Sequence, residues 1–236
     1  MNCLLCNDNK ITRIGEKNSY ELIVCESCDL KFTGRMPTAH ELETYYSDYF
    51  VEKNIKNAEK KKKRLKRLIR LISFWSKGKT FLDVGCSTGF AVGAAKELGY
   101  ESMGIDLSDK AIQAAKALFP TCKFRCQKTF DLVKEDQKFD FLMCREVIEH
   151  TTDPLAFAQS LSSLVTPGGI LYLTTPDAGH WRVPNDFVSW KEVVPPEHLF
   201  FFNAKNLRKL LEAVGFELIY KQPKFKPSLR VLARRL

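Results

Sequence analysis

Four cysteines near the start of the chain occur in two pairs that are spaced like the ligands of a metal ion. Each pair has the pattern Cys-x-x-Cys, and the four residues are Cys3, Cys6, Cys25 and Cys28. Each pair can form a tight turn that directs two thiolates at one ion, so the set predicts a closed tetrahedral zinc site with a structural role. The alternative of four ordinary buried thiols is disfavoured, because residues 1–35 hold too few apolar side chains to form a core without metal.

A loop bracketed by two glycines, within FLDVGCSTG at residues 81–89, is the second candidate site. An apolar run ends at Asp83, Gly85 and Gly89 bracket the loop, and a helical pattern follows. Glycine lets the backbone turn sharply and approach a ligand closely, and N–H groups at a helix start can face that ligand. The loop lacks the three glycines of a dinucleotide fingerprint. The Gly-Lys-Thr before it lacks the first glycine and the preceding strand of a P-loop.

The Gly-x-x-x-Gly spacing after an acidic residue resembles the first motif of class I S-adenosylmethionine (SAM)-dependent methyltransferases, and further matches follow in order. Asp106 ends the next apolar run, FDFLMCREVIEH at 139–150 resembles the family's fourth-strand motif, and Pro-Gly-Gly at 167–169 resembles its turn into strand five. EHLFFFNAKNLRKLLEAVGFE at 197–217 is similar to the closing segment of the ubiquinone-biosynthesis O-methyltransferases. The resemblance covers about residues 80–220 and implies a Rossmann-like methyltransferase sheet.

The resemblance also implies which residues hold SAM. The loop residues would hold the methionine half, Asp106 the ribose and Leu107 the adenine. Cys144 and Glu146 would lie near the transferable methyl. The family often has an acid near the adenine after strand three, but this chain has Lys128 and Thr129 there, so we expect backbone contacts. The cofactor-binding residues expected in this way are Asp83, Gly85, Cys86, Ser87, Gly89, Asp106, Leu107, Lys128, Thr129 and Cys144. The alternative for Asp106 is an acid that caps the next helix.

Methyl transfer from a sulfonium is an in-line displacement, so the protein mainly positions the reactants, and a hydroxyl acceptor also needs a base. The candidate catalytic residues are His198, His150 and Glu146. His198 is favoured as the base, because an ordinary histidine is mostly neutral at pH 7. An alternative is that Glu146, Glu149 and His150 bind a divalent cation such as Mg²⁺. His150 could instead cap a turn, and His198 could pack under a lid.

Apolar runs with strand and helix character alternate from residue 80, which predicts an α/β fold with a parallel sheet and helices on both faces. The expected strands are 80–84, 101–105, 122–126, 139–144, 169–174 and 216–220, and the expected helices are 90–98, 108–118, 153–164 and 204–214. Residues 177–198 form a long irregular insertion, which we expect to roof the acceptor pocket with Trp190 and His198 near the methyl. SLRVLARRL at the end has helical rather than strand character, so we expect a sheet that is one strand short.

The expected domain organisation has four parts. Residues 1–35 form the four-cysteine zinc-ribbon-like module, and 36–78 form a helical connector with a basic helix at 53–76. Residues 79–222 form the methyltransferase core with its lid, and 223–236 form a basic tail. Thr38 and Glu41 have the spacing of a capping box at the start of a connector helix.

Composition and charge narrow the class of protein. The sequence has 44% apolar residues and no apolar run of membrane-spanning length, which indicates a globular protein. No secretory signal peptide is recognisable at its start, which favours the cytoplasm. The net charge of +9 comes from the basic helix and the tail, whereas the remainder is acidic, which argues against a nucleic-acid partner. The basic helix could be a solvated face, attract an anionic acceptor or contact a membrane surface peripherally. No oligomeric state follows from the sequence.

The predicted function is a SAM-dependent methyltransferase that acts on a small-molecule acceptor, for which an anionic molecule is one of the options. The four-cysteine module followed by ELETYYSDYF resembles zinc-bearing members of the family, which often act in sugar pathways, so the favoured acceptor is a hydroxyl of a sugar or polysaccharide precursor. One alternative is a non-catalytic binding protein, and another is an RNA or protein methyltransferase. The chain lacks an Asn/Asp-Pro-Pro-aromatic motif after strand four, which argues against methylation of base amino groups.

Overall fold

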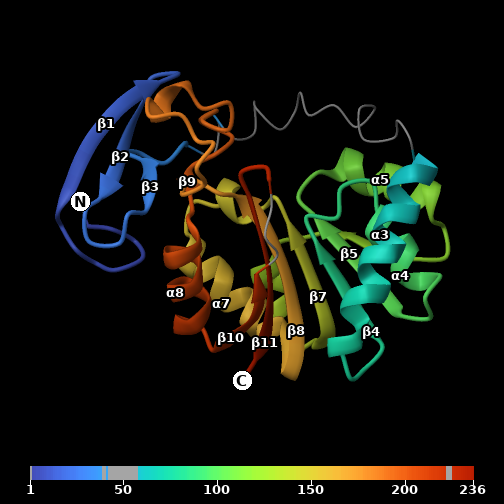
Figure 1. Cartoon of the computed structure of the whole chain (residues 1–236). Coiled ribbons are helices and arrows are strands. Elements are labelled where there is room, and N and C mark those ends of the chain that lie inside the picture. The colour runs from blue at the N-terminus through green and yellow to red at the C-terminus, as the bar shows by residue number, and fades with distance from the viewer. Residues whose placement is uncertain (1, 39–40, 42–57, 222–224) are drawn as a thin grey trace.

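A seven-stranded sheet with helices on both faces forms the larger part of the chain, and a four-stranded sheet flanks it (Figure 1). The computed structural model describes residues 2–38, 41, 58–221 and 225–236. No helix among these residues is both long and apolar enough to cross a membrane. The parallel strands of the large sheet, with helices on both faces, confirm the predicted α/β class.

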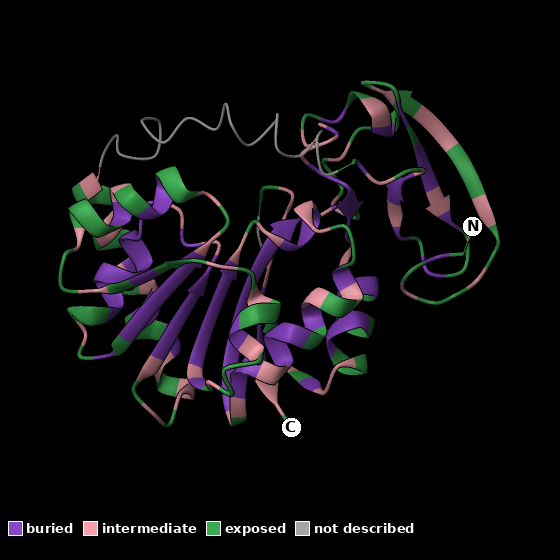
Figure 2. Cartoon of the chain, turned by 180° about the vertical axis from the view of Figure 1, so that it is seen from behind, coloured by how far each residue is buried: buried purple, intermediate pink, exposed green. Residues whose placement is uncertain are grey.

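Five parallel strands form the centre and one end of the large sheet. In spatial order they are β8 (Val165–Pro176), β7 (Phe139–Arg145), β4 (Thr80–Val84), β5 (Glu101–Asp106) and β6 (Lys123–Cys126). Their apolar runs are buried on both sides, and Figure 2 shows the central strands as mainly buried. Because the strands are parallel, their carboxyl ends meet at one edge, where ligands of open α/β sheets bind.

The chain has the last strand that the sequence analysis expected it to lack. β11 (Ser228–Arg235) runs antiparallel between β8 and β10 (Phe216–Lys221) and completes the sheet. Leu229, Val231 and Ala233 are buried in the core. The expectation of a helix and the description of 223–236 as a tail were wrong. Hydrogen bonding to a neighbouring strand on each side stabilises β11 as a strand, although the local sequence has helical character.

Helices cover the two faces of the sheet separately. One face is packed by α3 (Ala58–Ile72), α4 (Phe90–Lys96) and α5 (Asp109–Leu118), and the other by α6 (Thr129–Val133), α7 (Pro154–Leu164) and α8 (Ala204–Ala213). Asp153 and Asn203 cap α7 and α8 by accepting hydrogen bonds from backbone N–H groups. All of these helices except α6 were predicted.

The basic helix α3 is amphipathic, as predicted. Leu65, Ile69 and Ile72 are buried, whereas Lys62 and Lys66 form salt bridges with Glu97 of α4. Most of its other basic residues are exposed. Residues 53–57 of the predicted helix lie outside the described residues. The predicted capping box is present, because the Glu41 N–H donates to Thr38 Oγ1 and the Thr38 N–H donates to Glu41.

The N-terminal module and the insertion form one structural unit. The small sheet has the order β1 (Ile11–Lys17), β2 (Tyr20–Cys25), β3 (Lys31–Thr33) and β9 (Phe200–Phe201), so its last strand comes from just after the insertion. β1 and β9 were not predicted. Side chains of the insertion, including the short helix η3 (Phe187–Ser189), pack against β1 and β2 around Leu22 and Phe201. Residues far apart in the sequence therefore share one small apolar core.

Candidate functional site

The glycine loop after β4 lies at the carboxyl edge of the sheet. Gly85 and Gly89 have φ of +70° and +78°, the left-handed region that favours glycine. A Cβ at Gly85 would collide with Val147, and one at Gly89 would lie 2.6 Å from the Phe124 ring. Gly85 and Cys86 both donate to the carbonyl of Ile105 on β5. The loop is thereby held tightly against the strand end.

Asp106, at the end of β5, holds the same loop through its carboxylate. Oδ2 accepts a hydrogen bond from the Ser87 N–H at 2.8 Å, and Oδ1 accepts from the Ser108 N–H at 2.9 Å. Burial raises the pKa of Asp106, and these N–H donors oppose that shift. Each carboxylate oxygen still has a lone pair for a ribose hydroxyl. The helix α5 is capped by Ser108 and not by Asp106, which disfavours the capping alternative.

Asp83 is buried, and neither of its carboxylate oxygens has a hydrogen-bond partner among the described residues. Burial raises its pKa to about 7, and the nearby Arg145 opposes the shift. Arg145, at the end of β7, has a buried Nε that also lacks a partner in the described structure. An unpaired buried carboxylate near an incompletely paired guanidinium fits a zwitterionic ligand, and the methionine half of SAM carries one ammonium and one carboxylate. Sequence analysis missed Arg145, although an arginine that ends an apolar strand is a usable signal.

Leu107 and Phe130 lie at the carboxyl edge of the sheet, near the ends of β5 and β6. Their side chains are 62% and 61% exposed, and they follow β5 and β6 respectively. Lys128 is the N-cap residue of α6 and Thr129 its first residue. The predicted adenine contacts of Leu107, Lys128 and Thr129 therefore lie together near two strand ends, and they remain predictions.

Two predicted cofactor residues have side chains in the core. Cys86 packs with Val92 and Ile112 between α4 and α5, and Cys144 is fully buried with Leu142 and Leu173 on the other face of the sheet. Burial raises the pKa of both thiols well above the usual range. Only their backbone groups can face a ligand at the strand ends, so a contact of the Cys144 side chain with the methyl is not supported.

Glu149, His150 and His198 converge on one point. One ligand atom from each lies within 4.8 Å of the others. His150 Nδ1 lies 2.8 Å from the Glu197 carbonyl oxygen, and His198 Nδ1 lies 2.6 Å from the Glu192 carbonyl oxygen. A carbonyl only accepts, so each Nδ1 carries the proton, and the Nε2 of His198 keeps a lone pair for a proton or a metal. His150 also has the Glu146 carbonyl as a hydrogen-bond partner.

Burial perturbs the ionisation of this trio. It lowers the pKa of His150 to about 4, assisted by His198, and the imidazole is therefore neutral at pH 7. It raises the pKa of Glu149 well above the usual range, with the charge of Glu146 adding to the effect. One Glu149 oxygen accepts from Thr175 Oγ1 at 2.9 Å, whereas Oε1 is buried and unpaired within the described part of the chain. A buried carboxylate oxygen that lacks a hydrogen-bond partner and lies beside two imidazoles indicates a binding site.

Glu146 has a different environment from this trio. Its φ is +53°, and its Oε1 accepts a hydrogen bond from Thr174 Oγ1 at 2.5 Å. The structure therefore groups His198, and not Glu146, with Glu149 and His150. The sequence could not show this, because His198 is distant in the chain.

Trp190 packs inside the insertion. Its ring is buried in the small core shared with Leu22 and Phe201 of the N-terminal module. The prediction that Trp190 lies near the methyl stays a prediction. Trp181, by contrast, is 73% exposed.

The four N-terminal cysteines form a compact cluster. Their sulfur atoms lie within 4.8 Å of one another, with Cys3 to Cys28 at 3.6 Å and Cys6 to Cys25 at 3.4 Å. Zn–S bonds of about 2.3 Å in a tetrahedron place sulfur atoms roughly 3.8 Å apart, so the cluster fits zinc. Burial raises the pKa of the Cys3 and Cys28 thiols. A bound zinc ion would hold them as thiolates.

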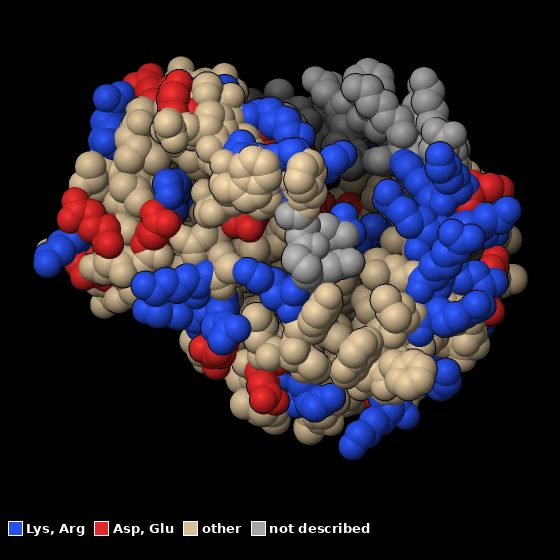
Figure 3. Space-filling view, viewed as in Figure 1, with Lys and Arg blue, Asp and Glu red and all other residues tan. Residues whose placement is uncertain are grey.

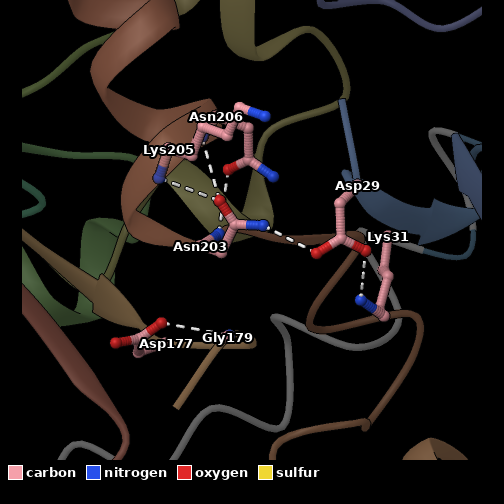
Figure 4. A network of polar contacts seen from close by, with 7 residues as sticks. All are labelled: Asp29, Lys31, Asp177, Gly179, Asn203, Lys205 and Asn206. Carbon is pink, nitrogen blue, oxygen red and sulfur yellow. Dashed lines mark hydrogen bonds and ion pairs between the residues drawn. The ribbon is translucent and has the colours of Figure 1, made fainter. Parts of the chain in front are cut away.

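The cysteine module is joined to the histidine site through β9. The Leu199 carbonyl accepts from the Thr33 N–H of β3 at 3.0 Å, and its N–H donates to the Glu149 carbonyl at 2.8 Å. A second link lies beside it, where Asn203 Nδ2 donates to Asp29 at 2.9 Å (Figure 4). Asp29 directly follows the Cys25–Cys28 pair. The cysteine cluster and the catalytic candidates are therefore separated by few hydrogen bonds.

Comparison with known proteins agrees with this geometry. The chain matches the family described as "Methyltransferase domain" over residues 57–221. A ubiquinone biosynthesis O-methyltransferase from Coxiella burnetii is 35% identical over 103 residues, which are 42% of this chain and 44% of the relative. One from Xanthomonas campestris is 37% identical over 103 residues, 42% of this chain and 43% of the relative. The matches thus span less than half of these relatives.

Solved structures show the same fold. A Pyrococcus horikoshii protein superposes with a TM-score of 0.65 at 18% identity, covering 82% of this chain and 99% of that one. Magnesium protoporphyrin IX methyltransferase from Synechocystis, solved with bound SAM, has a TM-score of 0.55 at 18% identity and covers 84% of this chain and 92% of that one. At this identity the likeness concerns the fold.

Proposed function

Because this chain belongs to the methyltransferase family, we propose that it transfers a methyl group from SAM to a hydroxyl of a small acceptor, a sugar or polysaccharide precursor. The observation that carries the proposal is the buried, unpaired carboxylate of Asp83 beside the glycine loop, together with the partly buried Arg145, whose Nε is buried without a partner in the described structure. They complement the ammonium and carboxylate of the cofactor's methionine half, as Asp106 complements its ribose.

The roles of the residues follow from their positions. The cofactor supplies a methyl group already activated by its sulfonium. Gly85 and Gly89 let the backbone approach the cofactor, and the Ser87 N–H is fixed by Asp106. Holding the acceptor and the cofactor in line supplies the larger part of the rate enhancement.

His198 is the proposed base. Its Nδ1–H is held by the Glu192 carbonyl, so Nε2 is oriented and free to accept the proton of the acceptor hydroxyl. His150 lies with its ring centre 4.8 Å away and stays neutral. The O-methyltransferases among the relatives are consistent with a hydroxyl acceptor.

A second role for the trio is supported by its geometry. Two imidazoles and a carboxylate within 4.8 Å could hold a divalent cation that binds the acceptor oxygen. Nitrogen ligands favour a transition metal over Mg²⁺, which prefers oxygen. The magnesium expectation, with Glu146 as a ligand, therefore has no support from the described residues.

Calorimetry with S-adenosylhomocysteine (SAH), followed by a screen of acceptors scored by SAH release from SAM, tests the proposal. We expect SAH to bind, and His198→Ala to lower turnover at least tenfold with SAH affinity unchanged. A chain that binds no SAH would be a non-catalytic binding protein. Strongly salt-dependent methylation of RNA or of a protein would replace the small acceptor. Activity that disappears with EDTA and returns with Mn²⁺, while the cysteine-bound zinc stays, would favour the cation role.

A further inference from the structure

Two arginines lie in one row across three strands at the carboxyl edge. Arg145 of β7 is in register with Thr174 of β8, and Thr174 is in register with Arg230 of β11. Residues in register on neighbouring strands point to the same face of a sheet. Met143, two residues before Arg145, is in register with Asp83, so this is also the face that carries Asp83. The row is thus adjacent to the proposed methionine site.

Both guanidinium groups are incompletely paired. The Nε atoms of Arg145 and Arg230 are buried without a hydrogen-bond partner, and neither residue forms a salt bridge with a carboxylate of the described ranges. Desolvating a cation without pairing it is unfavourable, and an anionic ligand removes that penalty. Planar guanidinium groups suit phosphate and carboxylate in particular.

The neighbouring charges show which arginine would have no anionic partner when SAM is bound. Asp83 and Arg145 match the two charges of the methionine half, and Glu146 is held by Thr174. Arg230 then remains, with the Tyr172 hydroxyl beside it. Tyr172 lies two residues before Thr174 on β8 and so points to the same face, where its hydroxyl forms a hydrogen bond with Arg230. Arg230 and Tyr172 thus form a polar pair that cofactor binding does not satisfy.

Exposed aromatic rings lie further along the hairpin from this pair. Ser228, two residues before Arg230, is in register with Pro176, and the Asp177 N–H donates to the Pro227 carbonyl. These contacts bring the start of the insertion to the hairpin tip, where the Arg182 guanidinium lies 3.6 Å from the ring centre of Phe225 and 4.7 Å from that of Trp181. Trp181 and Phe225 are 73% and 69% exposed.

The surface around the row is hollowed and basic. Figure 3 shows a hollow beside α3, with Lys and Arg side chains on both of its sides. A hollow rimmed by positive charge concentrates anions. Aromatic faces at the rim suit a ring that has an apolar side.

We propose that Arg230, with the Tyr172 hydroxyl, binds an anionic group of the acceptor, a phosphate or a carboxylate, while Trp181 and Phe225 contact the acceptor's ring. This inference rests on the proposed function. It narrows the acceptor class to anionic molecules such as sugar phosphates or uronic acids, and it places the acceptor over β8 and β11.

Titration calorimetry on the full chain saturated with SAH tests the site, with inorganic pyrophosphate and malonate as probes. We expect at least one to bind with a dissociation constant of about 1 mM or tighter. Arg230→Gln should weaken binding at least tenfold. Arg234→Gln, on the same strand but near the opposite edge, is the matched control and should change affinity less than twofold. Pyrophosphate binding would indicate a phosphate, and malonate binding a carboxylate.

Two results would overturn the inference. One is that neither probe binds the SAH-saturated protein, and the other is that both variants lose affinity equally, as a general charge effect would require. If Arg230→Gln does not fold, Tyr172→Phe replaces it and should weaken binding at least threefold, and unchanged affinity there would also refute the site. SAH affinity is measured in every variant, so a failure of the proposed function shows separately as a loss of SAH binding in the wild type.

Discussion

Asp83 should make the ligand-free protein less stable as the pH rises. Its carboxyl group is buried and unpaired in the described structure, and burial raises its pKa from 3.8 to about 7. Between about pH 4 and 7 the unfolded chain has released this proton whereas the folded chain keeps it. Folding therefore binds a proton, and the free energy of unfolding falls with rising pH. The loss is complete above about pH 7 and absent below about pH 4.

The size of the effect follows from the shift. A change from 3.8 to about 7 is about three pK units, and each unit corresponds to about 1.4 kcal/mol, so the ionised carboxylate destabilises the folded chain by about 4 kcal/mol. Asp83→Asn removes this titration. Any cost of burying the amide is the same at every pH, so the stability of the variant relative to the wild type should rise by about 4 kcal/mol between pH 4 and pH 8.

Thermal and urea unfolding at pH 4, 6 and 8 measure this change. For a chain of this length about 4 kcal/mol corresponds to roughly 8–16 °C in Tm. Saturating SAH should reduce the pH dependence of the wild type, because its ammonium would pair with the ionised carboxylate, and Asp83→Asn should bind SAH at least tenfold more weakly at pH 8. Asp136→Asn, at an exposed carboxylate, is the control. A difference between Asp83→Asn and wild type that does not vary with pH would refute the reasoning.

Three further predictions concern the zinc module, the ribose contact and the base. Cys25→Ser should abolish zinc binding, measured by elemental analysis. It should also lower turnover at least tenfold, because hydrogen bonds join β3 through Leu199 to Glu149, while SAH affinity stays within twofold. Full activity without zinc would contradict this link. Asp106→Ala should weaken SAH binding by about 1–3 kcal/mol in calorimetry, the scale of a lost charge-assisted hydrogen bond, and unchanged affinity would place the ribose elsewhere. His198→Ala should lower turnover and spare SAH affinity, whereas equal losses of both would make His198 a packing residue of the insertion.

Local patterns in the sequence determine much of this protein. The glycine loop, the acid at the end of the second core strand and the two cysteine pairs depend on residues close in the chain, so their spacing predicts their geometry. The alternation of apolar runs likewise predicts the five parallel strands and most of the helices, because burial on both faces requires continuous apolar segments.

Only the tertiary structure decides the features that depend on distant partners. β11 becomes a strand because β8 and β10 pair with both of its edges, although its sequence has helical character. β9 belongs to the sheet of the cysteine module because Phe200 and Phe201 pair with β3, which is distant from them in the sequence. The trio of Glu149, His150 and His198, and the row of Arg145 and Arg230, arise where separate strands end side by side. Such meetings depend on strand order and register, which a single sequence does not specify.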